Sequence, residues 1–313
     1  MRERRGAHGA KVVALGGGHG LYASLRALRL LTRNLTAVVT VADDGGSSGR
    51  LREEFDILPP GDLRMALSAL CDDGEWGLTW RDVLQYRFAS DGPLNGHSLG
   101  NLLLTGVWDL LGDSVEGLDL VGRLLDTKGR VVPMAATPLR IEADVLDGTQ
   151  TRRVVGQVAV ASSDNEISKV YVFPENPPAF PQALSAVHEA DWVIFGPGSW
   201  YTSVIPHLLV PQLHEALRNT AARRALVINL VRDSETKGLS PADHIRSFHE
   251  HSPDLRLDAI IVDEDSVTDW EDLSHAASEC GATIHSASVR SRHNEACHDS
   301  LHLAAVFREL LDS

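Results

Sequence analysis

The sequence predicts an α/β protein with a Rossmann-like, doubly wound and mainly parallel sheet that carries an inserted antiparallel β subdomain. Two observations predict the main sheet: apolar strands alternate with helical patterns, and several strands run directly into glycine-rich loops. A third observation, closely spaced strands after residue 130, predicts the insert. We expect a flexible tail over 1–10, a nucleotide-binding core over 11–130 and 176–313, and the β-rich insert over 131–175.

The first half of the core begins with a short apolar strand at 11–15 that enters a glycine turn at 16–20. A helical pattern comes next, with leucines at positions 21, 25, 28 and 31. The second strand, at 35–42, is apolar and β-branched, as is typical of a strand buried on both faces. Right-handed crossovers would make these strands parallel. Helical periodicity then dominates over 63–125.

The pattern changes near residue 130. Strands are predicted at 131–134, 139–146, 153–161 and 170–173, and their short connections favour antiparallel pairing. A proline-rich stretch at 174–181 closes this insert. The α/β alternation then resumes, with strands at 191–195, 225–230 and 259–262 and a helix at 211–220.

Composition excludes several classes of protein. The chain of 313 residues carries 29 basic and 43 acidic residues, a net charge of −14, which argues against a nucleic-acid-binding surface. Only three cysteines occur, without a C-x-x-C pair, so neither a disulfide framework nor a zinc knuckle is expected. No apolar run reaches the roughly 18 residues of a membrane span, and the first ten residues lack the apolar stretch of a signal peptide. We therefore expect a cytoplasmic protein.

The first glycine turn predicts a phosphate site. Gly17, Gly18 and Gly20 lack side chains that could obstruct a ligand, and His19 is the exception. Amides at the start of the next helix favour a negative charge. The spacing is not the dinucleotide G-x-G-x-x-G, and no P-loop Lys-Ser/Thr is present after it. A tight strand-to-helix turn without a ligand is the alternative interpretation.

The second glycine-rich loop, at 43–50, joins two carboxylates to an anion-binding composition. Asp43 and Asp44 could bind ribose hydroxyls or a Mg²⁺ ion that carries a diphosphate. Arg50 could contact the anion through its guanidinium. The pattern G-x-S-x-G of a nucleophile elbow also occurs here, but the loop comes after the second strand and stays polar, which disfavours a serine hydrolase. The other candidate residues of this loop are Gly45, Gly46 and Ser47.

Two helix starts add further candidates. Asp62 is a plausible helix cap, and Arg64 in the same first turn favours an anion, because a cation is otherwise disfavoured there. Ser98 is the expected cap of the next apolar helix. His97 and Asn101 could equally satisfy backbone groups or reach a ligand.

A third loop that is rich in glycine and hydroxyl residues comes after the buried strand at 191–195. Its glycines and hydroxyls again suit a phosphate or a sugar. Two residues at and beyond the end of the next strand, Asn229 and Arg232, could face the same cleft. A small cluster of His293, Cys297 and His298 has no further Cys/His pair at ligand spacing, so metal binding there is not expected. The candidates in the loop itself are Gly196, Gly198, Ser199 and Thr202.

Several strings resemble one family. They are ALGGGHGL at 14–21, TAVVTVADDGGSSGRLR at 36–52, LPPGDLRMAL at 58–67, GHSLGNLLL at 96–104, KGRVVPM at 128–134, FGPGSWYTSVIPHLLVP at 195–211 and SETKGLSPADH at 234–244. Together they resemble the gluconeogenesis factor (YvcK) family, within the superfamily of 2-phospho-L-lactate transferase (CofD). The likeness is to actinobacterial-type members, which carry His19 where many relatives have threonine.

The resemblance implies a Rossmann-like core that binds a uridine diphosphate sugar, such as UDP-GlcNAc or UDP-glucose. Family members look like cytoplasmic regulatory factors, needed for cell shape and wall synthesis on gluconeogenic carbon sources, with no established reaction. The ligand-facing positions it implies are Gly17, Gly18, His19 and Gly20 at the phosphate, Asp43 and Asp44 near ribose or metal, and Ser47, Arg50, Asp62, Arg64, His97, Asn101, Gly198, Ser199 and Thr202 along the cleft.

These patterns leave three functional hypotheses. The first is a binding protein for a nucleotide sugar that catalyses no reaction, forms a homodimer and signals to a partner in cell-wall synthesis or regulation. The second is a CofD-like transferase that moves a phosphoryl-linked group with Mg²⁺ as its cofactor. The third, an NAD(P)-dependent oxidoreductase, is disfavoured by the glycine spacing.

Overall fold

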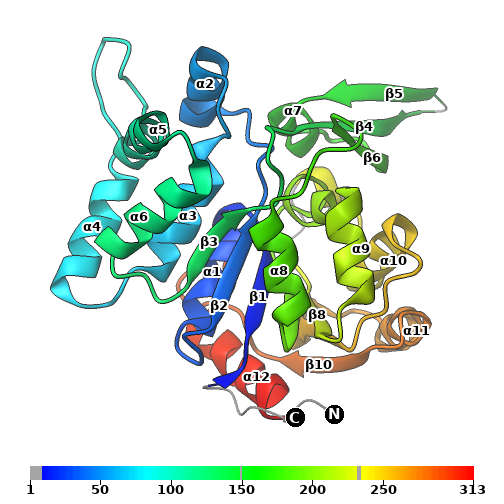
Figure 1. Ribbon diagram of the computed structural model, residues 1–313. Helices are drawn as coiled ribbons and strands as arrows, with labels where there is room; N and C mark the ends of the chain where they lie inside the picture. Colours follow the sequence, from blue (N-terminus) through cyan, green and yellow to red (C-terminus); the bar gives the residue numbers. More distant parts are fainter. Residues whose placement is uncertain (1–8, 149, 231–233) are drawn as a thin grey trace.

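The computed structural model describes residues 9–148, 150–230 and 234–313 (Figure 1). Within them lies a seven-stranded sheet in the order β10-β9-β8-β7-β1-β2-β3, and every neighbouring pair is parallel. The predicted α/β class is confirmed. The strands are β1 (Val12–Gly16), β2 (Leu35–Val39), β3 (Arg130–Pro133), β7 (Trp192–Phe195), β8 (Arg223–Val227), β9 (Ala259–Asp263) and β10 (Thr283–Ala287).

The strand order reverses at β1. From β1 the chain moves outward through β2 and β3 on one side, and then returns to β7 on the other side and moves outward through β8 to β10. The loops after β1 and β7 therefore leave the same edge of the sheet in opposite directions. Such a switch point opens a crevice at the carboxyl ends of the strands, where ligands of open α/β sheets bind.

Helices cover both faces of the sheet because its strands are apolar on both sides; β1, β7 and β9 are buried at every position. Helix α1 (Gly18–Leu28) packs against α3 (Pro60–Leu70) and α12 (Ser300–Asp312), whereas α8 (Pro181–Glu189) and α9 (Pro211–Asn219) pack together in front of the sheet in Figure 1. None of the helices in the described ranges has the length and apolar character that a bilayer span requires. The other helices of this size are α2 (Gly46–Phe55), α4 (Glu75–Gln85), α5 (Leu99–Leu111), α6 (Ser114–Leu124), α10 (Pro241–His251) and α11 (Trp270–Glu279).

The predicted antiparallel insert is a separate three-stranded sheet in the order β5-β4-β6, made of β4 (Arg140–Asp147), β5 (Gln150–Val155) and β6 (Ile167–Phe173). The strand expected at 131–134 is not part of it. As β3, it pairs in parallel with β2 at the edge of the large sheet, and its three apolar residues are buried there. Short connections predicted an antiparallel neighbour, but the partner of β3 lies about ninety residues earlier in the chain.

The strand expected at 153–161 is wrong in its second half. Gly156 adopts a positive φ of 101° and ends β5, and residues 157–161 form the short helix α7 (Gln157–Ala161). Residues 1–8 of the predicted tail lie outside the described residues. Ala10, predicted as the end of the tail, is buried, and its carbonyl accepts a hydrogen bond of 2.7 Å from the Thr32 hydroxyl.

Candidate functional site

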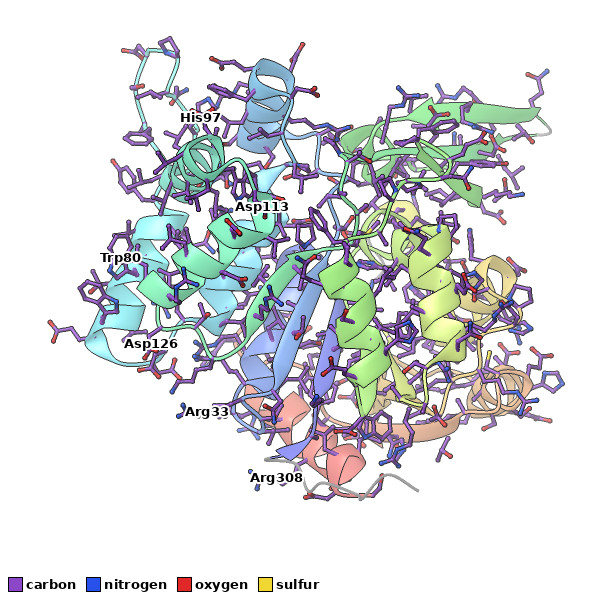
Figure 2. The ribbon with its side chains drawn as sticks, viewed as in Figure 1. Arg33, Trp80, His97, Asp113, Asp126 and Arg308 are labelled. Atoms are coloured by element: carbon purple, nitrogen blue, oxygen red, sulfur yellow. The ribbon has the colours of Figure 1, made fainter. Side chains whose placement is uncertain are left out.

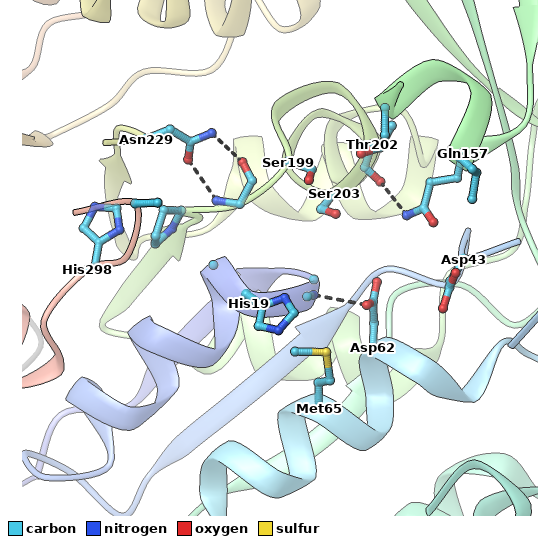
Figure 3. Close-up of a pocket in the computed structure, with 18 of the residues that line it drawn as sticks. His19, Asp43, Asp62, Met65, Gln157, Ser199, Thr202, Ser203, Asn229 and His298 are labelled. Carbon is cyan, nitrogen blue, oxygen red and sulfur yellow. Dashed lines mark hydrogen bonds between the residues drawn. The ribbon is translucent and has the colours of Figure 1, made fainter. Parts of the chain in front are cut away.

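A cavity of about 480 Å³ lies at the switch point of the sheet (Figure 3). Its walls come from the loops after β1, β2, β7 and β8, from the starts of α1 and α3, from α7 of the insert and from the segment before α12. The residues that line it are Gly17, Gly18, His19, Gly20, Asp43, Asp62, Met65, Gln157, Val158, Ala161, Ser162, Pro197, Gly198, Ser199, Thr202, Ser203, Asn229, Leu230, Ala296 and His298.

The glycine turn presents the start of α1 to this cavity. Gly17 is extended and caps the helix, and Gly18 has a positive φ of 58°, which favours glycine. The Gly18 amide donates a hydrogen bond of 3.1 Å to Oδ1 of Asp62. The amides of His19 and Gly20 belong to the first turn, where N–H groups have no intrahelical acceptor. These amides are suited to an anionic ligand.

The loop after β7 crosses close above the same turn. A Cβ atom on Gly20 would lie only 2.3 Å from the Pro197 carbonyl oxygen, so the two backbones can approach only because residue 20 is glycine. Asn229 holds the loop from the other side. Its Oδ1 accepts from the Gly198 amide at 3.0 Å, and its Nδ2 donates to the Gly198 carbonyl at 2.8 Å. Asn229 thus binds the loop with both ends of its side-chain amide.

The turn at 199–204 is anchored by Trp200. Its indole is fully buried, donates to the Ser247 hydroxyl at 3.3 Å and meets His244 edge to face at 4.9 Å between ring centroids. With Trp200 held in the core, the backbone on either side of it faces the cavity. Three hydroxyl-bearing residues, Ser199, Thr202 and Ser203, line it there.

One end of the cavity is acidic. Asp43 and Asp62 both line it, and Gly61 makes room for Asp43, because a Cβ at residue 61 would lie 2.4 Å from its Oδ2. Oδ2 of Asp62 is buried and has no hydrogen-bond partner among the described residues. Burial, together with repulsion from Asp43, raises the pKa of Asp62 to about 7, although the Gly18 amide and Arg64 act in the opposite direction.

This acidic end fits Mg²⁺ only in part. Mg²⁺ is usually held by one or two carboxylates, with phosphate oxygens and water completing its shell. The described residues contain no group of three or more His, Cys, Asp or Glu side chains that could hold a metal ion by itself. Asp43 and Asp62 could therefore hold Mg²⁺ together with the phosphates of a ligand.

Asp44, predicted as the second metal or ribose ligand, does not line the cavity. Its carboxylate accepts hydrogen bonds from the amides of Gln157 and Val158, at 2.8 and 3.0 Å, and so caps α7 from a distant part of the chain. Gln157 also donates from its side chain to the Thr202 carbonyl at 3.5 Å. Asp44 therefore positions the wall of the cavity that the insert contributes.

We expect Asp44→Ala to loosen this wall. Loss of a helix cap costs about 1 kcal/mol, and a five-residue helix has little stability of its own. The variant should stay folded and bind the cavity's ligand several-fold more weakly. Hydrogen exchange of residues 157–161 should accelerate, and Asp91→Asn, an exposed change elsewhere, should leave that exchange rate unaltered. Unchanged exchange in Asp44→Ala would contradict this role.

Five predicted site residues form a separate buried network between α2, α3 and α5: Ser47, Arg64, His97, Ser98 and Asn101. None of them lines the cavity. His97 lies beside α5 among the helices at the upper left of Figure 2.

Ser47 is the centre of this network. Its Oγ accepts from the Asn101 side chain at 3.0 Å and from the Ser98 amide at 3.3 Å. The hydroxyl proton of Ser47 is then directed to Nδ1 of His97, 3.0 Å away. Burial and the nearby Arg50 charge lower the pKa of His97, which favours the neutral, accepting ring. Ser47 is 3% exposed, so the serine of the G-x-S-x-G string makes a buried structural contact.

We expect Ser47→Ala to destabilise the protein by about 1–3 kcal/mol, because it leaves the Asn101 amide and the His97 ring without their buried partner. Ligand affinity should change by less than about twofold in the folded protein. Urea denaturation measures the first effect and calorimetry the second. A large loss of affinity without a loss of stability would instead place Ser47 in the binding site.

The other predicted residues lie away from the cavity lining. Arg50 is exposed on α2 and donates to the carbonyls of Pro93 and Asn95, at 3.1 and 2.8 Å. Arg64 donates to Oδ1 of Asn101 at 2.8 Å and also to Gln85, and burial lowers the pKa of Arg64 to about 10. Arg232 lies outside the described residues. Three glycines also do not line the cavity: Gly45 and Gly46 at the start of α2, and Gly196 after β7.

Sequence reasoning missed the contributions of α7 and of the C-terminal segment. Met65 could have been found, since it lies one turn after Asp62 on the same helix. The sequence pattern places the lining residues of α7 in a strand. It also groups His298 with His293 and Cys297, yet His298 lines the cavity, whereas those two do not. The distance in sequence between His298 and the glycine turn hides their relation.

An open, doubly wound sheet with a glycine-lined cavity at its switch point defines a class of α/β protein whose ligands bind at the carboxyl ends of the strands. The family model described as 2-phospho-L-lactate transferase CofD matches residues 12–299. The chain is 50% identical over 303 residues to a "Putative gluconeogenesis factor" from Mycobacterium tuberculosis strain CDC 1551, covering 94% of this chain and 88% of that protein.

More distant relatives have the same name or the same fold. The "Gluconeogenesis factor" of Bacillus subtilis strain 168 is 37% identical over 260 residues, 83% of this chain and 80% of that protein. A crystal structure of a UPF0052-family protein from Bacillus halodurans superposes with a TM-score of 0.84 at 32% identity, covering 95% of this chain and 98% of that one. The chain therefore belongs to the CofD family, among the proteins named gluconeogenesis factor, as the sequence resemblance predicted.

Proposed function

We propose that this protein binds a nucleotide diphosphate sugar, of the UDP-GlcNAc or UDP-glucose type, and acts as a regulatory factor rather than an enzyme. The observation that carries the proposal is the cavity itself. The glycine turn and Gly198 of the loop after β7 lie against each other and both line it, and backbone amides in such a place suit a diphosphate. Its volume of about 480 Å³ lies within the range of small-ligand sites.

The charges of the cavity indicate how a diphosphate would be accepted. Among the described lining residues there is no Lys or Arg side chain, whereas Asp43 and Asp62 are acidic. A diphosphate close to two carboxylates would be repelled. Mg²⁺ between them would remove that repulsion and supply charge neutralisation. We therefore expect binding to depend on Mg²⁺.

The names of the relatives support a regulatory role, since they are called gluconeogenesis factors. The uridine nucleotide and the hexose come from the family resemblance of the sequence motifs. A role in cell shape and wall synthesis, a location in the cytoplasm, a protein partner and a homodimer stay predictions.

Calorimetric titration with UDP-GlcNAc, with Mg²⁺ and with EDTA, tests the proposal. We expect saturable binding in Mg²⁺, at least tenfold weaker binding in EDTA, and recovery of chemically unchanged nucleotide. Asp43→Asn should weaken binding in Mg²⁺, and Asp91→Asn, a distant exposed acid, should not. Absence of binding to UDP-GlcNAc and UDP-glucose in both conditions would refute the proposed function.

A second function is favoured by one observation. Asp62, with a pKa of about 7, is partly protonated at neutral pH and sits in the cavity beside Asp43, as a general base would. In a CofD-like transfer, an acceptor hydroxyl would attack the distal phosphorus, the diphosphate P–O bond would break, nucleoside monophosphate would leave, and Asp62 would take the hydroxyl proton. Release of nucleoside monophosphate that requires both Asp62 and an alcohol acceptor would establish this reaction.

A further inference from the structure

Strand β10 is the last strand at one end of the large sheet, and within the described residues no strand lies beyond it (Figure 1). Its neighbour β9 pairs with it in parallel on one side only. Thr283 and Ser286 are exposed, and the other three residues of the strand are half-buried. The outer edge of β10 is therefore open to another strand.

The backbone groups of Ile284 and Ser286 point to this open side. The Thr283 amide donates to the Asp258 carbonyl at 3.0 Å, which fixes the phase of the ladder with β9. In a parallel pair, alternate residues direct both their N–H and their C=O group to the same neighbour, so Thr283 and every second residue after it bond to β9. In the described ranges the backbone groups of Ile284 and Ser286 make no hydrogen bond. A further strand could therefore pair with them.

The other three edges of the two described sheets carry residues that oppose such pairing. Proline lacks the N–H group that a ladder needs, and charged side chains on an edge disfavour the approach of a similar edge. Strand β3 contains Arg130 and Pro133. Strand β5 contains Arg152 and Arg153, and β6 contains Lys169. Strand β10, with the sequence Thr-Ile-His-Ser-Ala, contains no proline, lysine, arginine, aspartate or glutamate.

We propose that two copies of this protein form a two-fold symmetric dimer in which their β10 strands pair antiparallel and join the two large sheets into one. The antiparallel direction results from the two-fold axis, because the same segment of each copy then meets itself reversed. With the axis beside His285, Ile284 of one copy and Ser286 of the other exchange both of their backbone hydrogen bonds. No residue of β10 lines the cavity, so this inference is independent of the proposed function.

The surface at this edge is large enough for a dimer. Helices α11 and α12 both contact β10, and α12 also packs against α1. Since the chain moves outward in opposite directions on the two sides of β1, right-handed crossovers place α11 on the face opposite α1. The edge thus has three layers, each about 10 Å thick, and a five-residue strand is about 17 Å long, which gives about 500 Å² on each copy. Two such surfaces reach the roughly 1,000 Å² expected of a specific interface.

Two substitutions at Ser286 would interrupt the pairing without removing a hydrogen bond to β9. Ser286→Pro removes the outward N–H group, and an edge strand tolerates proline at such a position. Ser286→Lys keeps the N–H group and adds the kind of charge that the other edges carry. Ser286→Ala keeps the backbone and removes only the hydroxyl. Ser90→Lys, the same charge change at an exposed serine in the loop before α5, is the matched control.

Sedimentation equilibrium at protein concentrations up to about 100 µM measures the dissociation constant of the dimer. We expect the wild type to sediment at twice the 34.0 kDa of one chain. Ser286→Pro and Ser286→Lys should raise the dissociation constant by about tenfold or more, with the circular dichroism spectrum of the wild type. Ser286→Ala and Ser90→Lys should change it by less than about threefold. If Ser286→Pro alters the spectrum, Ser286→Lys decides.

Three results would overturn the proposal. The first is a wild-type protein that stays monomeric over this range of concentration. The second is a dimer that neither Ser286→Pro nor Ser286→Lys weakens, because its interface would then lie elsewhere. The third is a dimer that Ser286→Ala weakens as much as Ser286→Pro does, because the hydroxyl rather than the backbone would then make the contact.

Discussion

Asp62→Asn is expected to make the ligand-free protein more stable at pH 8 and to abolish Mg²⁺-dependent ligand binding. The unfolded carboxyl ionises near pH 4, whereas burial and the Asp43 charge keep the folded one protonated up to about pH 7. Wild-type stability therefore falls as the pH rises through this range. The difference corresponds to about 4 kcal/mol above pH 7.

The net gain should be smaller than that figure. Asparagine can still accept from the Gly18 amide, but its NH₂ group would occupy the place of Oδ2, which has no partner among the described residues. We expect a net gain of about 2 kcal/mol at pH 8 that disappears by pH 4. Urea denaturation at the two pH values measures it, with Asp91→Asn as the control that should change neither. An equal effect at both pH values would show that ionisation of Asp62 is not the cause.

Gly20→Ala should destabilise the protein by about 3 kcal/mol and eliminate ligand binding. The new Cβ would lie 2.3 Å from the Pro197 carbonyl oxygen and 2.4 Å from the Gly198 Cα, both backbone atoms that cannot turn aside. The start of α1 and the loop after β7 would have to separate, and both of these segments line the cavity.

The same substitution at Gly106 is the matched control. Gly106 lies inside α5 with no atom within 4 Å of the position of a Cβ, so alanine there should stabilise the helix by about 1 kcal/mol. Chemical denaturation should therefore show a lower free energy of unfolding for Gly20→Ala and a higher one for Gly106→Ala than for the wild type. Destabilisation of similar size in both variants would contradict the importance of the contact between Gly20 and the loop after β7.

The sequence predicted much of the fold because local patterns determine it. Uniform burial of β1, β7 and β9 results from their apolar runs, and the glycine turn depends on the positive φ at Gly18. The two wrongly predicted segments are ones whose interaction partners lie far away in the sequence. Residues 131–134 pair with β2, and residues 157–161 form a helix because Gly156 ends the strand and Asp44 caps the helix that begins there.

The residues of the candidate site also fall into those that the sequence could predict and those that it could not. Gly17, Gly18, Gly20 and Gly198 could be assigned to the cavity from sequence, because in a parallel sheet every carboxyl end lies at the same edge. Six polar candidates also line it, namely His19, Asp43, Asp62, Ser199, Thr202 and Asn229. The others do not, since the direction of a polar side chain depends on the groups that pack beside it. Asp43 turns into the cavity while its neighbour Asp44 turns to the insert, and Ser47, Arg64, His97 and Asn101 pair with one another instead.

By itself the sequence determined the fold class, the family and the glycine turn at the start of α1, because these depend on periodicity, on residue type and on backbone freedom. Only the tertiary structure decided which carboxylates face each other, and that a histidine near residue 300 closes a cavity opened near residue 17. Such pairings form when strands far apart in the chain become neighbours in the sheet, and burial then decides which polar atoms have partners and which remain for a ligand.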